Sequence, residues 1–193
     1  MSPIRRIAAV GIVLAGLTST LAAQDRGWMV QAFGGGYSHI NNLNAAGTAH
    51  WNTGFNIGAA LGYQATEYVS VQADFTMAQN KAVGITSFAD KKFNRYYYGA
   101  HLELRYPIGE TISPYLFAGG GAVTVSERGG TEIANFTKPA GMFGAGFMVA
   151  LPNSRASVLL EGKGLMYQWD RGGFKKTQLD VGYSVGLAYR FGR

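Results

Sequence analysis

Apolar and polar side chains alternate at every second residue, and this alternation constrains the fold of the chain more than any other feature. In the segment 179–191 the odd positions hold Leu, Val, Tyr and Phe, whereas the even positions hold small or charged residues. The segments 69–78 and 95–106 follow the same rule. Because successive side chains of a β-strand point to opposite faces, this period predicts strands with one apolar and one polar face.

Five further segments have a noisier form of the same alternation. They lie at 27–38, 54–64, 114–126, 139–151 and 156–167. Each of the eight segments is about 11 residues long, which suits a tilted strand that crosses a bilayer. The segments 27–38 and 156–167 are ambiguous, and in the latter Leu159 and Leu165 share a face with Glu161 and Lys163. The sequence therefore predicts eight antiparallel strands in an all-β, up-and-down barrel.

The connections between these segments alternate in length. The longer ones are polar and lie at 39–53, 79–94, 127–138 and 168–176. The shorter ones lie at 65–67, 107–113 and 152–154. This asymmetry predicts a barrel with four long loops at one end and short turns at the other, which is typical of barrels in bacterial outer membranes.

The N-terminus has the pattern of a cleaved export signal. Arg5 and Arg6 precede an apolar stretch at 7–17, and the small residues Ala22 and Ala23 follow it. The stretch is shorter than the roughly 20 apolar residues that a membrane-spanning helix needs. We therefore expect residues 1–23 to be a signal peptide and residues 24–193 to form the barrel domain.

The residues of the polar face distinguish a membrane barrel from a soluble, lipocalin-like barrel. A water-facing exterior should be rich in charged residues, but here the polar face is mostly Gly, Ala, Ser and Thr. Charged residues make up 15% of the chain, below the roughly 25% of ordinary soluble domains. Small side chains suit the narrow interior of an eight-stranded barrel, so the polar face is predicted to line the lumen of a transmembrane barrel.

A set of charged residues falls on the predicted inner face. Its members are Asp74, Arg95, His101, Glu103, Arg105, Glu161, Lys163, Asp180 and Arg190. Without the histidine, four are positive and four are negative. Isolated charges away from water are very costly, so these residues are expected to form one paired network that fills the lumen.

Aromatic residues gather near the strand ends at the short turns and are expected to face lipid as an interfacial girdle. They are Tyr63, Tyr68, Tyr106, Tyr115, Tyr189 and Phe191.

The stretch 114–121 (PYLFAGGG) and the final Tyr189-Arg190-Phe191 resemble small eight-stranded outer-membrane β-barrels of the OmpA-transmembrane-domain and OmpX type. The resemblance covers the whole of 24–193 and implies a place in the cell outer membrane. It also implies that Tyr189 and Phe191 form the signal that the barrel-assembly machinery reads. A departure from the family pattern is that Gly192 and Arg193 follow Phe191.

The sequence offers few groups for catalysis. It has no cysteine, which excludes thiolate metal sites and cysteine nucleophiles. His39 and His50 fall in the first long connection, where solvated polar residues are expected. His101 lies on the inner face beside Glu103, without the nearby serine that barrel enzymes acting on lipid A have. We expect no enzyme activity, cofactor or metal.

Basic residues are frequent in the outer loops and beside them. They are Lys81, Lys91, Lys92, Arg171, Lys175 and Lys176. They are compatible with simple solvation and also with contact to lipopolysaccharide phosphates. The expected partners are therefore outer-membrane lipids and lipopolysaccharide, with no nucleic acid, and the sequence names no extracellular partner.

The leading functional hypothesis is a structural or surface-interaction role for a barrel with a packed, charge-paired lumen and four extracellular loops. Two alternatives remain open at this point. One is an enzyme that modifies the acyl chains of lipid A, and the other is a narrow pore for small solutes.

Overall fold

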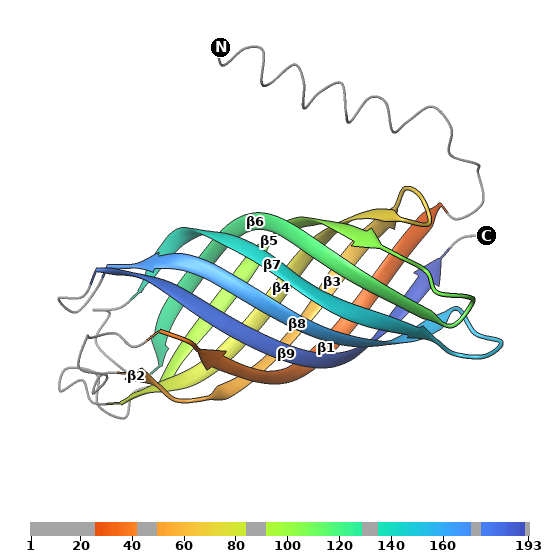
Figure 1. Cartoon of the computed structure of the whole chain (residues 1–193). Helices are drawn as coiled ribbons and strands as arrows, with labels where there is room; N and C mark the ends of the chain where they lie inside the picture. Colours follow the sequence, from red (N-terminus) through yellow and green to blue (C-terminus); the bar gives the residue numbers. More distant parts are fainter. Residues whose placement is uncertain (1–25, 42–49, 84–91, 129–134, 171–174, 192–193) are drawn as a thin grey trace, which may run out of the picture.

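A computed structural model describes residues 26–41, 50–83, 92–128, 135–170 and 175–191. In these residues one antiparallel sheet closes on itself to form a barrel (Figure 1). Eight long strands build it: β1 (Gly27–His39), β3 (Gly54–Gln64), β4 (Val69–Val83), β5 (Lys92–Arg105), β6 (Ile112–Arg128), β7 (Phe136–Ala150), β8 (Ala156–Trp169) and β9 (Lys176–Phe191). Each strand pairs with its neighbours in chain order, and β1 pairs with β9 to close the barrel. The predicted eight-stranded antiparallel barrel is confirmed.

A short additional strand, β2 (His50–Trp51), lies in the connection that follows β1 and pairs with Val83 and Ala82 of β4. The predicted signal peptide lies outside the described residues. No helix in the described ranges is long and apolar enough to cross a membrane.

The two faces of each strand differ as the alternation predicts. In β4, Gln72 and Asp74 are buried in the lumen, whereas Val71 and Phe75 are about half exposed on the outer face. In β8, Leu159 and Leu165 are buried beside the inward-pointing Lys163. The lumen of β8 therefore holds apolar and charged side chains together, which is why its sequence pattern was ambiguous.

The strands extend farther into the long connections than the alternation predicts. The β4–β5 ladder continues to Lys81 and Lys92, in a region expected to be loop, and β9 already begins at Lys176. Backbone hydrogen bonds of a hairpin continue beyond the membrane, where the outer face meets water and holds Lys81 and Lys92, while inward residues such as Ala82 and Phe93 are apolar and stay buried. The alternation therefore marks mainly the part of each strand that faces lipid.

The short turns lie together at one end of the barrel, at 65–68, 106–111 and 151–155. Two residues in these turns have positive φ, namely Gly109 at 63° and Asn153 at 54°. The start of β1 and the end of β9 lie at the same end, where Trp28 pairs with Phe191 (Figure 1). This end is called the short-turn end below, and the opposite end is called the long-loop end.

Aromatic side chains form a belt on the outer face near the short-turn end, with one difference from the prediction. Tyr63, Tyr106 and Tyr189 are exposed there, and Trp28 joins them with its ring 5.3 Å from that of Tyr63. Tyr115 was wrongly assigned to this belt. It is buried in the lumen because the inward positions of β6 are the odd-numbered ones.

Candidate functional site

Buried aromatic rings gather at the long-loop end of the barrel. Trp169 of β8 lies in their centre, 5.2 Å from Trp51, 5.1 Å from Phe136 and 6.3 Å from Phe93. Trp51 and Phe93 are themselves 5.0 Å apart with nearly perpendicular planes. We call these four residues the aromatic plug. Since all of them are buried, they leave little room for water along the barrel axis at this height.

Below the aromatic plug lies an outer polar cluster around Asp180 and Arg95. The Asp180 carboxylate accepts a hydrogen bond from the Tyr37 hydroxyl and lies 3.0 Å from His39 Nε2. Arg95 Nε lies 3.9 Å from Asp180 and 2.9 Å from the Tyr167 hydroxyl oxygen, to which it donates. The guanidinium carbon of Arg95 also lies 4.4 Å from the centre of the Trp51 ring. The cluster thus joins the polar lumen to the aromatic plug.

A middle polar cluster surrounds the Lys163 ammonium group. Lys163 Nζ donates to Asp74 Oδ2 at 2.7 Å and lies 3.4 Å from Glu161 Oε1. It also lies 4.4 Å from the centre of the Phe33 ring. Asp74 accepts a second hydrogen bond, from Thr76, at 2.9 Å. One buried cation therefore has two carboxylates and a ring as neighbours.

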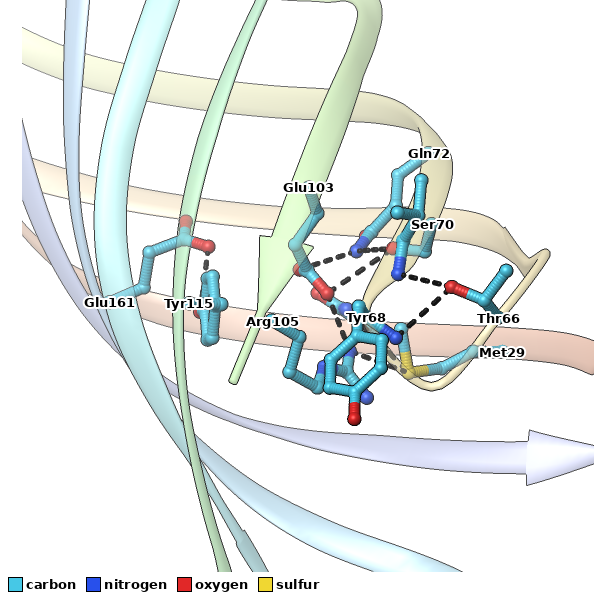
Figure 2. A network of polar contacts seen from close by, with 11 residues as sticks. Met29, Thr66, Tyr68, Ser70, Gln72, Glu103, Arg105, Tyr115 and Glu161 are labelled. Carbon is cyan, nitrogen blue, oxygen red and sulfur yellow. Dashed lines mark hydrogen bonds and ion pairs between the residues drawn. The ribbon is translucent and has the colours of Figure 1, made fainter. Parts of the chain in front are cut away.

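An inner polar cluster lies nearest the short-turn end (Figure 2). The Glu103 carboxylate accepts from Arg105 at 2.5 Å, from Gln72 at 2.7 Å and from Ser70 at 3.2 Å. Figure 2 also shows Tyr115, the cross-strand partner of Arg105, which donates to Glu161 at 3.0 Å. Every carboxylate of the lumen set thus has a hydrogen-bond donor beside it, as buried charges require.

The described contacts group these charges into three clusters, whereas the sequence led us to expect one network. The strands are tilted against the barrel axis, so residues that all point into the lumen still lie at different heights along that axis. His101 packs its ring 4.9 Å from Phe117, and none of the hydrogen bonds described here joins it to Glu103. Arg190 is half-buried at the short-turn mouth, where it lines a recess of about 400 Å³ with Arg105 and Arg155.

His39 is the functional candidate that sequence reasoning misplaced. We expected it in a solvated loop, but it ends β1 with its side chain 1% exposed, between Asp180 and the Trp51 ring. The alternation could have located it, because the odd-numbered residues of β1 point inward and His39 is the next odd-numbered residue after Tyr37. A rule that stops a strand at the first polar residues cannot detect this.

The basic residues near the outer loops do not all lie on one surface. Lys81, Lys92 and Lys175 are exposed, whereas Lys176 is half-buried at an inward position of β9. Lys91 and Arg171 lie outside the described residues. At the other end, Tyr189 and Phe191 are exposed on β9 with ring centres 4.9 Å apart.

No group of three or more metal-ligating side chains occurs in the described part of the chain. The carboxylates of the lumen instead lie beside Arg95, Arg105 and Lys163, under the aromatic plug and inside an apolar outer face. A closed barrel with a lipid-compatible exterior and an aromatic belt is the architecture of a transmembrane β-barrel, because every backbone polar group is satisfied within the sheet.

The chain belongs to the outer membrane protein beta-barrel domain family, whose model matches residues 7–193. It is accordingly located in the outer membrane. The short-turn end is the periplasmic end, and the long-loop end is the extracellular end.

Several solved outer-membrane barrels have the same fold. Neisserial surface protein A is 18% identical, with a TM-score of 0.68 and coverage of 86% of this chain and 97% of that one. OprG from Pseudomonas aeruginosa is 15% identical, with a TM-score of 0.55 and coverages of 87% and 98%. The N-terminal barrel domain of Pseudomonas aeruginosa OprF is 12% identical, with a TM-score of 0.50 and coverages of 86% and 100%. No curated protein matches the chain.

Proposed function

We propose that the protein is a sealed outer-membrane barrel whose role is structural or interactive, and that it neither conducts solutes nor catalyses a reaction. The observation that supports this most directly is the aromatic plug above the three polar clusters. An ion path needs a continuous wet lumen, often with a ring of one charge sign. Here opposite charges lie beside one another under buried rings.

The enzyme alternative has little support in the geometry. The contact between His39 and Asp180 resembles part of a catalytic set, but both side chains are at most 1% exposed under Trp51. His101 is also buried, against Phe117. A lipid substrate would have to reach these groups through the wall or through the aromatic plug.

Conductance in planar bilayers tests the sealed lumen. The unmodified protein should give no steady current. Trp169→Ala removes the central ring of the aromatic plug and should produce brief openings at most, because the polar clusters still fill the lumen below. Trp28→Ala, at a lipid-facing tryptophan, is the matched control. Large, stable channels from the unmodified protein would contradict the proposal.

A test of the enzyme alternative is the mass of lipid A extracted from cells with and without the protein. We expect identical acyl-chain patterns. A loss or gain of an acyl chain that depends on the protein would instead support catalysis.

Our proposal also includes two sets of envelope partners. Exposed Tyr189 and Phe191 are suited to recognition by the barrel-assembly machinery, so Phe191→Ala should slow assembly in cells more than Leu187→Ala. The exposed basic residues Lys81, Lys92 and Lys175 at the extracellular rim are suited to contact with lipopolysaccharide. Of the other predicted contacts, Lys176 points inward, and Lys91 and Arg171 lie outside the described residues.

A further inference from the structure

Three cationic side chains lie next to one another on the outer face of the extracellular rim. Lys81 of β4 and Lys92 of β5 are direct cross-strand partners, and Lys92 is in turn the partner of Arg128 of β6. All three are exposed, at outward positions of strands that lie side by side (Figure 1). We call these three residues the basic row. Sequence spacing does not reveal it, because Arg128 is 36 positions from Lys92.

The surroundings of the basic row place it at the level of lipid headgroups. Toward the membrane, Phe75 and Tyr96 stack on the outer face with ring centres 6.5 Å apart. Between these rings and the basic row, Gln79 donates to Asn94 at 2.8 Å, an amide pair suited to the membrane interface. Lys92 lies four residues beyond Tyr96, which is about 13 Å along the strand. The cations therefore stand just outside the apolar band.

The basic row is unfavourable unless an anion accompanies it. Neighbouring strands are about 4.8 Å apart, so the three residues span about 10 Å, which is comparable to the Debye length at physiological salt. Like charges directly opposite one another destabilise a sheet. In the described residues, no carboxylate forms an ion pair with any of the three.

We infer that the basic row binds the phosphate groups of lipid A in the outer leaflet. This inference rests on the proposed contact with lipopolysaccharide and assigns it to one site. Arg128 offers a forked pair of donors and the lysines offer point charges, a combination that matches phosphate oxygens. By contrast, Lys176 points inward beside Trp169, so it does not extend this surface.

The inference is tested by whether a single substitution stabilises or destabilises the barrel in vesicles of different lipids. Lys92→Gln removes the central charge of the basic row, and its effect on the unfolding equilibrium constant in urea is measured in three kinds of vesicle. In phosphatidylcholine vesicles it should stabilise the barrel about twofold to fivefold, because repulsion is relieved. In vesicles that contain lipid A it should destabilise the barrel about fivefold, because a phosphate contact is lost.

Arg155→Gln changes the net charge equally at an exposed residue of the short-turn end, at the opposite end of the barrel from the basic row, and is the matched control. In phosphatidylglycerol vesicles the two variants should change the stability of the barrel by the same amount. In lipid A vesicles Lys92→Gln should lose more stability than the control variant. The inference would be overturned if the two variants were equally stable in phosphatidylglycerol and also in lipid A vesicles. It would also be overturned if Lys92→Gln changed stability in the same direction in phosphatidylcholine and lipid A vesicles.

Native mass spectrometry of the protein in detergent is a second measurement that does not depend on refolding. The unmodified protein should retain added lipid A, and Lys92→Gln should retain less. Retention unchanged by Lys92→Gln would also overturn the inference. Neither experiment depends on conductance, so failure of the basic row is distinguishable from failure of the sealed-lumen proposal.

Discussion

Two lysine–carboxylate ion pairs of this barrel differ in depth. Lys163 and Asp74 meet in the middle of the lumen with side chains 6% and 2% exposed. Lys138 and Asp170 meet at the extracellular rim with side chains 28% and 27% exposed. The buried lysine has Glu161 and the Phe33 ring as further neighbours. The chemistry of the pairs is the same, but the solvent around them differs.

This difference explains how the barrel places its charges. In the lumen water is scarce, so each charge requires an opposite charge and hydrogen bonds. At the rim water and salt screen charges, so an ion pair adds little, and the repulsion between like charges in the basic row is weaker than it would be in the lumen. Substitutions in the lumen, on the lipid face and at the rim test this contrast.

Lys163→Met should have the largest effect. It leaves Asp74 and Glu161 buried without their cation, and breaking a buried pair in this way costs about 3–5 kcal/mol. Urea unfolding in lipid vesicles measures the loss. Adding Asp74→Asn and Glu161→Gln to the same chain should recover part of it. A loss as small as that of a rim pair would mean that water fills the lumen.

Leu102→Arg tests the opposite face of the wall at membrane depth. A cation on the lipid face near mid-membrane should cost about 2–4 kcal/mol in refolding into vesicles. Gln79→Arg, on the same face but at the membrane interface, should cost about 0–1 kcal/mol. Equal costs at the two depths would mean that Leu102 does not face lipid or that it does not lie near the middle of the membrane.

Tyr115→Phe should have a smaller effect, because it removes one hydrogen bond to Glu161 and keeps the ring. Leaving a buried acceptor without its donor costs about 1–3 kcal/mol, and we expect the lower half of that range because Lys163 remains near Glu161. Tyr106→Phe on the exposed belt is the control and should be nearly neutral in the same unfolding measurement.

Lys138→Gln should have the smallest effect. An ion pair that is open to solvent at the rim contributes about 0–1 kcal/mol, and salt screens it. Unfolding measured at low and high salt should therefore show a small difference between variant and parent that shrinks as salt is added. A large loss that salt does not change would mean that this rim pair behaves like the lumen pair.

The sequence alone predicted the antiparallel barrel and the inward position of most charges. Parity along a strand is a local property, so Asp74 and Lys163 were assigned to the lumen without knowledge of their neighbours. Parity failed where a strand continued past its apolar part. His39 and Lys92 were therefore assigned to loops, although both lie in strands. Tyr115 was misassigned because the parity of β6 was not determined.

Which charges meet was decided by the tertiary structure. Lys163 and Asp74 are 89 positions apart and come together only when the closed, tilted sheet brings them to the same height. The same stagger brings Arg128 beside Lys92 and divides the lumen into three clusters. Periodicity determines on which side of the wall a residue lies, whereas the register between strands determines its height. Register depends on pairings between distant strands, so no local pattern specifies it.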